Sequence, residues 1–380
     1  MDALTTPSNW QRVRLGDIAE IIGGGTPSTQ ITSFWNGSIN WFTATEIGIT
    51  KYVHKSQRTI TPLGLKKSSA KLLPIGTILL TSRASIGDCA ILKVAATTNQ
   101  DFQSLIPLEK INNEFLYYLM LTLKNKLLKL ASGSIFLGVS PNKIKNLLIP
   151  LPPLNEQIAI ANILSDVDRY LYSLDALILK KEGVKKALSF ELLSQRKRLK
   201  GFNQAWQRVR LGDICEITTG SLDANEMVHY GKYRFYTCAK EYYFIDKYAF
   251  DTEAILISGN GAYVGYVHYY KGKFNAYQRT YVLDNFSEHI IFVKYFLTMF
   301  LQSHIQTNRN EGNTPYIVMA TLKDFEILLP PLNEQVAIAN ILSDLDHEII
   351  SLKNKKRQFE NIKKALNHDL MSAKIRVLKK

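Results

Sequence analysis

The chain has 380 residues, 46% of them hydrophobic, which is enough for two or three domains with buried cores. Lysine and arginine outnumber aspartate and glutamate by 47 to 33, and the net charge of +14 favours an anionic partner, nucleic acid before an acidic membrane surface. The three cysteines share no CxxC spacing, the apolar runs are too short to cross a bilayer, and the N-terminus has no signal-peptide core. We therefore expect a cytoplasmic protein without disulfides or membrane contact.

The first recognisable element is an opening motif that the chain uses twice. The segment WQRVRLGDIAEI begins at Trp10 and returns as WQRVRLGDICEI at Trp206. The first copy is eighteen residues longer, and the extra residues lie between about Ile22 and Ser82. This region holds GGGTPSTQ and SFWNGSINWFTATEIG, which have no clear counterpart in the second copy. A nearly identical frame around different inserts is typical of a duplicated unit that reads two different targets; duplication followed by drift is the alternative.

Each copy continues as short strands, glycine-rich turns and one helix. The segments Gly76–Leu92 and Glu253–Tyr270 predict paired strands joined by a tight turn, and Asn113–Leu130 and Glu288–Gln306 predict the matching amphipathic helix. We therefore expect an α+β fold, with α/β-type domains in which helices flank a twisted sheet.

Two groups of side chains in these halves suit either structure or nucleic acid. Twelve of the 19 tyrosines lie between Tyr230 and Tyr281, which favours sheet packing, with nucleotide stacking as the alternative. The insert of the first half is rich in basic residues. They form either a solvated surface or a path for DNA phosphates, and they are Lys51, His54, Lys55, Arg58, Lys66, Lys67 and Lys71.

Each copy closes on LPPLNEQ, at Leu151 and again at Leu329, followed by a long tail. Because paired prolines precede helices but do not sit inside them, we expect Asn155 to cap a helix. Apolar residues then recur with heptad spacing for about six heptads, which predicts a coiled-coil helix of about 45 residues in each copy. The predicted seam residues are Ile160, Leu164, Val167, Leu171, Leu174 and Ile178 in the first copy and Ile338, Leu342, Leu345, Ile349, Leu352 and Phe359 in the second.

Each seam needs a partner, and the other copy is the obvious one. An internal pseudo-two-fold repeat would make the two long helices antiparallel. Four lysines fall within the seams and either set the register or extend to its edge, namely Lys181, Lys185, Lys356 and Lys363. The expected organisation is a first recognition domain at 1–150, a long helix within 151–203, a second recognition domain at 204–328 and a second long helix within 329–380.

No convergent set of catalytic residues is visible in the sequence. It lacks the Glu-x-Lys of common nucleases, a phosphate-binding loop, HExxH and any Cys/His cluster, so we expect no metal site. The residues from Asn313 to Tyr316 only weakly match the Asn/Asp-Pro-Pro-Tyr motif of adenine methyltransferases, and the glycines around Asn260 only imitate a dinucleotide loop. The sequence therefore predicts a binding protein rather than an enzyme.

The repeated LPPLNEQ helix, the WQRVRLGD openings, GGGTPST (Gly23–Thr29) and TSRASIG (Thr81–Gly87) together resemble the specificity subunits of type I restriction–modification systems, over essentially the whole chain. The resemblance implies two target recognition domains, each reading one half of a bipartite, asymmetric site in double-stranded DNA. It implies that the long helices set the unread gap and dock two modification subunits. It leaves open whether two restriction subunits also join.

The resemblance also implies that this chain is not itself an enzyme and binds no cofactor. S-adenosylmethionine for adenine N6 methylation, and ATP and Mg²⁺ where a restriction subunit is present, would belong to the partner subunits. Three alternatives remain: the specificity subunit of a related system with a fused methylase–nuclease partner, a methyltransferase hidden in weak motifs, and a non-catalytic coiled-coil adaptor that binds DNA without reading its sequence.

Major-groove readout uses Arg on guanine and Asn or Gln on adenine, presented on loops or strand ends. We therefore expect DNA contacts from Ser82, Arg83, Ser85, Asn99 and Gln100 in the first half and from Asn260, Tyr263, Asn275, Tyr277, Gln278 and Arg279 in the second. Gln100 and Gln278 match between the copies, which favours a supporting or phosphate-binding role for this pair.

Overall fold

The computed structural model describes residues 7–133, 137–308 and 315–377. The chain divides into two compact units: unit 1 is Met1–Leu174 with Lys355–Lys380, and unit 2 is Asp175–Asn354. Each unit therefore combines one globular half with a part of both long helices. None of the helices in the described ranges is long and apolar enough to span a membrane.

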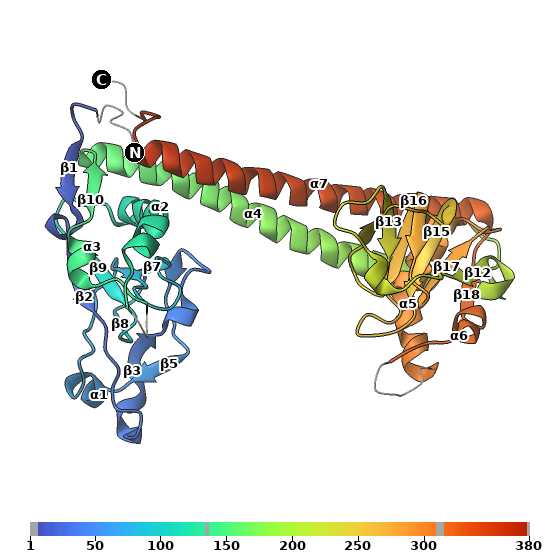
Figure 1. The fold of residues 1–380 in the computed structure, drawn as a ribbon, viewed down its shortest axis with the longest axis horizontal. Coiled ribbons are helices and arrows are strands. Elements are labelled where there is room, and N and C mark those ends of the chain that lie inside the picture. Colours follow the sequence, from blue (N-terminus) through green and yellow to red (C-terminus); the bar gives the residue numbers. More distant parts are fainter. Residues whose placement is uncertain (1–6, 134–136, 309–314, 378–380) are drawn as a thin grey trace. The chain divides into compact units, whose positions relative to one another are not determined.

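Unit 1 contains three sheets and short helices (Figure 1). A two-stranded sheet pairs β1 (Gln11–Arg14) with β10 (Leu148–Leu151). The five-stranded sheet has the order β2 (Ala19–Gly23), β9 (Gln103–Pro107), β6 (Ile78–Leu80), β7 (Cys89–Leu92), β4 (Tyr52–Val53), and the three-stranded sheet the order β5 (Arg58–Ile60), β3 (Trp35–Phe42), β8 (Ala96–Thr98). The helices are η1 (Leu15–Asp17), η2 (Thr32–Phe34), η3 (Ala44–Glu46), α1 (Pro62–Lys66), α2 (Asn113–Leu130) and α3 (Pro141–Lys145).

Unit 2 has the same plan with one larger sheet. β11 (Gln207–Arg210) pairs with β18 (Glu326–Leu329). The six-stranded sheet has the order β12 (Glu216–Thr219), β17 (Thr280–Asp284), β15 (Phe250–Ser258), β16 (Val267–Ala276), β13 (Tyr233–Tyr236), β14 (Tyr243–Ile245). The helices are η4 (Leu211–Asp213), η5 (Ala224–Glu226), α5 (Ile290–Asn308) and α6 (Met319–Lys323). The expected paired strands and flanking helix are therefore present in both units.

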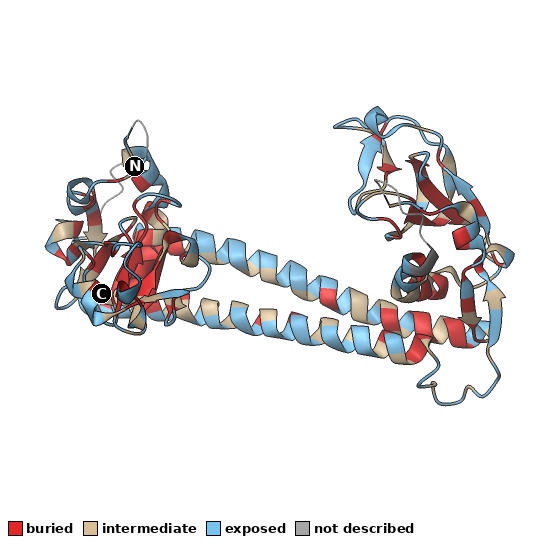
Figure 2. Ribbon diagram, turned by 90° about the horizontal axis from the view of Figure 1, so that it is seen from below, coloured by how far each residue is buried: buried red, intermediate tan, exposed pale blue. Residues whose placement is uncertain are grey.

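The central strands of the larger sheets consist mainly of buried residues, which Figure 2 shows in red. In β6, Ile78 and Leu80 pack in the cluster that contains α2, while Leu79, between them, packs in a second cluster on the opposite face. In β15, Ile257 faces α5 and Leu256 faces the other way. The alternation of side chains along a strand explains this division, and the expectation of an α+β fold is confirmed.

The inserts that differ in sequence share a topology. β3 lies parallel to β8 with Phe42 opposite Thr98, and β13 lies parallel to β16 with Tyr236 opposite Ala276. On its other side β3 pairs with the antiparallel strand β5, and β13 pairs in the same way with β14. Most of the extra length of unit 1 falls between β3 and β6, where it forms η3, β4, β5 and α1.

The long helices are α4 (Leu154–Leu193) and α7 (Leu332–Met371), with 40 residues each. The expected cap at Asn155 is wrong by two positions. The carbonyl of Pro153 accepts the first helical hydrogen bond from the Gln157 N–H (3.0 Å), and the Asn155 side chain accepts instead from the N–H of Glu156 (2.9 Å). The first helix is also shorter than expected and ends before Gln195, whose backbone has φ 62°.

The helices run antiparallel in each unit, as the repeat predicts. In unit 1, Tyr170 packs on Phe359 with ring centroids 4.7 Å apart, and Asp168 pairs with Lys363. In unit 2, Glu182 pairs with Lys353 at 2.6 Å and Lys185 pairs with Asp346. Residue numbers rise along one helix as they fall along the other.

All of the predicted seam residues are at least half-buried. Seven of the predicted seam residues are buried, namely Ile160, Leu164, Leu174, Ile178, Ile338, Leu342 and Ile349. The other five are half-buried, namely Val167, Leu171, Leu345, Leu352 and Phe359. Two seam lysines form ion pairs across the helices, Lys185 with Asp346 and Lys363 with Asp168, which favours their role in setting register.

Candidate nucleic-acid interface

The predicted DNA-contacting residues gather at one edge of the sheet in each unit. In unit 1 the turn between β6 and β7 lies beside the turn between β8 and β9, because the Ser82 N–H donates to the Asp101 carbonyl at 2.7 Å. A third segment joins them, with the Val139 N–H donating to the Ser82 carbonyl at 2.8 Å. We call residues 81–88, 98–102 and 137–139 the recognition edge of unit 1.

Unit 2 repeats this arrangement. The Gly259 N–H donates to the Arg279 carbonyl at 2.8 Å, and the Ile317 N–H donates to the Gly259 carbonyl at 2.9 Å. Residues 258–266, 276–280 and 315–317 form the recognition edge of unit 2. The glycine-rich turn here connects two strands without a helix, which excludes the dinucleotide loop considered from the sequence. Of the weak methyltransferase motif, Asn313 and Thr314 lie outside the described residues.

A glycine that directly follows the second strand of each copy, β2 or β12, abuts this edge. A Cβ on Gly24 would lie 1.9 Å from the carbonyl oxygen of Asn99, and a Cβ on Gly220 would lie 1.9 Å from that of Ala276. Only glycine permits so close a backbone approach. The end of the second β-strand of each copy therefore approaches the recognition edge in the same way in both units.

Several predicted residues present exposed side chains here. Arg83, Ser85 and Gln100 are exposed in unit 1, and Tyr263, Gln278 and Arg279 in unit 2, while Asn260 and Tyr277 are half-buried. Ser85 has φ 54°, in the left-handed region, as expected at the tip of a tight turn. The two matching glutamines each contact the segment after the second strand of their copy, Gln100 bonding to Thr26 and Gln278 donating to Asp223 at 2.8 Å.

Three predicted residues are buried and bonded within their unit. The Ser82 hydroxyl donates to the Asp101 carbonyl at 3.1 Å, and the Asn99 amide donates to the Asp101 carboxylate at 2.8 Å. The Asn275 side chain donates to the Lys247 carbonyl at 3.3 Å. These side chains shape the recognition edge, and the exposed residues above are the ones placed to reach a ligand.

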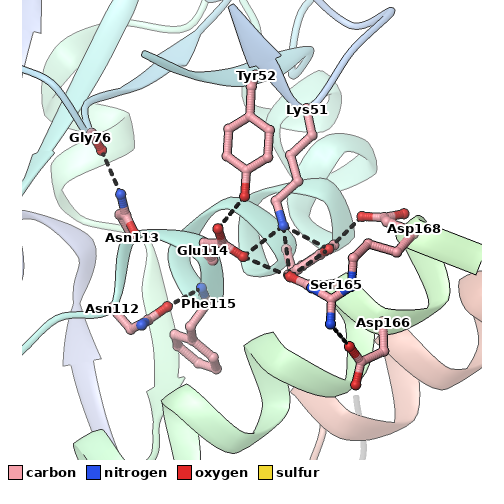
Figure 3. Close-up of polar contacts among 12 residues, drawn as sticks. Lys51, Tyr52, Gly76, Asn112, Asn113, Glu114, Phe115, Ser165, Asp166 and Asp168 are labelled. Atoms are coloured by element: carbon pink, nitrogen blue, oxygen red, sulfur yellow. Dashed lines mark hydrogen bonds and ion pairs between the residues drawn. The ribbon is translucent and has the colours of Figure 1, made fainter. Parts of the chain in front are cut away.

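The basic residues of the unit 1 insert likewise divide into exposed residues and one internal residue. Six of its seven residues are exposed, but Lys51 points inward (Figure 3). Its ammonium donates to Glu114 at 2.7 Å, to Ser165 at 2.8 Å and to the Tyr118 hydroxyl at 3.0 Å. Its side chain is only 12% exposed, so the expectation that it follows phosphates is wrong for this residue. Lys51 instead ties the insert to α2 and α4.

This contact changes the pKa of Glu114. Burial alone would raise the pKa of its carboxyl, but hydrogen bonds from Lys51, Ser165 and Tyr52 outweigh burial and lower the pKa to about 2. Burial also lowers the pKa of Lys51 in spite of the adjacent carboxylate. The unfolded chain has a Glu pKa of about 4.3.

We therefore expect Glu114 to stabilise unit 1 above about pH 4.3 and to lose this contribution as the pH falls from there towards about 2. The loss should be on the order of 1 kcal/mol, because the site is partly open to water. Urea unfolding of the wild type and of Glu114→Gln at pH 6 and pH 3 measures it. Glu114→Gln should show a smaller difference between the two pH values, whereas Glu109→Gln, at an exposed position before the same helix, should match the wild type.

The repeated motifs also form a structural clasp that the sequence analysis missed. In unit 1 the Glu156 carboxylate accepts from the Trp10 indole at 3.1 Å and from Arg376 at 3.0 Å. In unit 2 Glu334 accepts from Trp206 at 3.1 Å and from Arg198 at 2.7 Å. The tryptophan of WQRVRLGD thus meets the glutamate of LPPLNEQ, together with an arginine that follows the other long helix.

The adjacent glutamine of LPPLNEQ connects the start of a shorter helix, α2 in unit 1 and α5 in unit 2, to the proline turn. Gln157 accepts from the Asn112 N–H at 3.0 Å and donates to the Pro152 carbonyl at 2.9 Å. Gln335 accepts from the His289 N–H at 3.0 Å and donates to the Pro330 carbonyl at 2.8 Å. The only signal in the sequence was the recurrence of both motifs, with the two clasp arginines at the same spacing as the LPPLNEQ motifs. No group of His, Cys, Asp and Glu that could hold a metal ion occurs among the described residues.

Comparison with known proteins agrees with this architecture. The family model described as the type I restriction modification DNA specificity domain matches twice, at residues 7–181 and 203–361. The type I restriction enzyme MjaIX specificity subunit of Methanocaldococcus jannaschii is 28% identical, over 98% of this chain and 94% of that protein. The EcoDI specificity subunit of Escherichia coli is 38% identical over 44% of this chain and 37% of its own length.

Solved structures show the same fold. The S subunit of a type I restriction–modification system from Mycoplasma genitalium aligns with a TM-score of 0.63 at 19% identity, covering 97% of both chains. The HsdS subunit from Thermoanaerobacter tengcongensis aligns with a TM-score of 0.54 at 18% identity, covering 98% of this chain and 99% of that one. Because the family model covers most of the chain in two copies, the protein belongs to the type I restriction–modification DNA specificity family.

Proposed function

We propose that this chain is the DNA-reading subunit of a type I restriction–modification complex, and that the recognition edge of each unit reads one half of a bipartite, asymmetric site. The observation that carries the proposal is that the two edges share one backbone hydrogen-bond frame but present different side chains. A shared frame preserves how each unit is placed on the duplex, while the side chains select the bases.

The chemistry of the exposed residues supports base reading. Arg83 in unit 1 and Arg279 in unit 2 carry the groups that pair with guanine edges in the major groove. The net charge of +14 supplies the attraction to the phosphate backbone. The neighbouring side chains differ between the two edges, for example Ser85 in unit 1 and Tyr263 in unit 2. The two units would therefore recognise different half-site sequences.

In this proposal the chain supplies specificity and the partner subunits supply catalysis. The long helices set the number of unread base pairs and hold two modification subunits, which would bind S-adenosylmethionine and methylate adenine at N6. ATP and Mg²⁺ would act in restriction subunits where these are present. Such a complex works where the DNA is, which is the cytoplasm in a bacterial or archaeal cell.

The test is the genomic pattern of N6-methyladenine in cells that express this chain with its modification subunit, compared with cells that lack this chain. A new bipartite motif with a fixed gap, lost without the chain, is the expected result. If the partner is active and bound but no motif appears, the adaptor alternative, which holds DNA without reading it, replaces the proposal.

Arg83→Ala should relax one base position in one half-site. If Arg83 donates to guanine, the loss of this contact should cost about 1–3 kcal/mol of discrimination at that position. Methylation of a duplex panel, with each base pair of the site varied in turn, measures this cost. Arg279→Ala is the matched control, because it should relax a position in the other half-site; a uniform loss over all sequences would identify Arg83 as a phosphate contact.

A further inference from the structure

Unit 1 holds an arginine flat against tryptophan outside the recognition edge. Arg58 on β5 lies opposite Trp41 on β3, and its guanidinium is 3.8 Å from the ring centroid of Trp35 and 5.3 Å from that of Trp41. Both indoles are buried and meet edge to face at 5.0 Å, whereas Arg58 is exposed. The rings therefore form a fixed platform for a cation that remains open to solvent.

Unit 2 holds an arginine in a comparable place. Arg234 on β13 lies between two tyrosine rings, 4.2 Å from the centroid of Tyr242 and 4.4 Å from that of Tyr270. It also donates to the Tyr236 hydroxyl at 3.3 Å. Both arginines lie on antiparallel strand pairs, β3 with β5 in unit 1 and β13 with β14 in unit 2. These strand pairs are the parts of the two units that differ in sequence.

Each platform is connected to its recognition edge. In unit 1 the Trp41 indole donates to the Gly25 carbonyl at 2.9 Å and the Trp35 indole to the Ser28 carbonyl at 3.0 Å, on either side of the Thr26 hydroxyl that bonds to Gln100. This gives the GGGTPST segment a role: it joins the arginine platform to the recognition edge.

In unit 2 the connection runs through aromatic rings. Tyr236 meets His268 with centroids 5.2 Å apart, and His268 meets Tyr266 of the recognition edge at 4.7 Å. The Tyr277 N–H, also in the edge, donates to the Tyr236 carbonyl at 2.9 Å. The same surface thus continues from the edge to Arg234.

The electrostatics favour a ligand at both positions. Neither Arg58 nor Arg234 forms an ion pair with a carboxylate among the described residues, although Arg208 and Arg210 in unit 2 do so with Glu326 and Asp324. Stacking on a ring covers a face of the guanidinium and leaves its N–H donors free at the edge, all in one plane. Because stacking already restricts the side chain, binding a ligand costs less conformational entropy. That arrangement suits a pair of acceptors in a plane, such as N7 and O6 of guanine.

We propose that Arg58 and Arg234 are further base-reading residues, each donating to the N7 and O6 atoms of a guanine in the half-site of its own unit. This inference rests on the proposed function and extends it from the recognition edge to the strand pairs where the units differ. It requires that each half-site contain a G·C pair that the edge residues do not read.

The test uses the complete complex with its modification subunits and measures methylation rates on duplexes in which each base pair is varied. Arg58→Lys keeps the charge but removes the planar fork. We expect it to lose about 5- to 150-fold in discrimination at one guanine of one half-site, with the other half-site and the gap unchanged. Arg234→Lys should do the same in the other half-site. Arg12→Lys, at an exposed position on β1, should change nothing.

Replacing that guanine by 7-deazaguanine removes the N7 acceptor without changing the base pair. It should slow the wild type but not Arg58→Lys. Equal slowing of both proteins, a uniform loss over all sequences, or a half-site without a G·C pair would overturn the inference. Failure of the proposed function would look different, because the wild-type complex itself would then show no bipartite motif.

Discussion

Insertion of one heptad into both long helices is expected to lengthen the unread gap of the DNA site by about three base pairs. Seven helical residues add roughly 10.5 Å, and one base pair of B-DNA rises about 3.4 Å. The inserts belong after Leu174 in α4 and after Asn354 in α7, at the boundaries of the two units. At these points they leave intact the Asp168–Lys363 pair of unit 1 and the Lys185–Asp346 pair of unit 2.

The measurement is the N6-methyladenine motif in cells that carry the modification subunit, with both half-sites expected to stay unchanged. Insertion of two residues instead of seven is the control. It rotates the apolar stripe by about 200°, to the opposite side of the helix, and should break the seam, so methylation should be lost rather than shifted. A heptad variant that methylates the original gap would refute the proposal that helix length sets the spacing.

Replacement of Glu334 by alanine is expected to destabilise unit 2 by about 1–3 kcal/mol, because it leaves the half-buried Arg198 and Trp206 without their hydrogen-bond acceptor. The carboxylate is 0% exposed and accepts from Arg198 and from the Trp206 indole. The variant loses the clasp that ties the second WQRVRLGD opening to α7. Native-state hydrogen exchange of amides in α5 and β15 measures this loss within unit 2.

Glu326→Ala provides the control in the same unit. Glu326 forms an ion pair of the same length, 2.7 Å, with Arg208, but both side chains are more than half exposed. Such a surface pair contributes about 0–1 kcal/mol. Equal losses of protection in Glu334→Ala and Glu326→Ala would contradict the role assigned to the clasp, since Glu334 is buried and also accepts from Trp206, whereas Glu326 is exposed.

The inserts illustrate what an internal sequence comparison misses. SFWNGSINWF and the segment around Arg234 share no pattern, yet each forms a strand that pairs in parallel with a neighbour, β8 in unit 1 and β16 in unit 2. Backbone hydrogen bonds and the shape of the shared frame specify this pairing, and many side chains are compatible with it. The side chains are therefore free to differ, as the proposed reading of two half-sites requires.

The candidate DNA-binding residues stay predictions, but the structure separates them by exposure. The sequence placed all eleven at turns and strand ends. Only packing showed that Ser82, Asn99 and Asn275 make their hydrogen bonds inside the unit, whereas Arg83 and Arg279 are exposed. The sequence offered no sign that Arg58 and Arg234 lie on aromatic platforms, because the rings come from other turns and strands.

The sequence by itself determined the duplication, the two long helices and their seam. These properties are periodic or repeated, so that they can be read from neighbouring residues without knowledge of the fold. The tertiary structure alone decided that Lys51 is internal and that Glu156 and Glu334 are clasped by arginines beyond the other helix. The partners of these charges lie 63, 220 and 136 residues away, and only folding brings such distant groups into one hydrogen-bonded site.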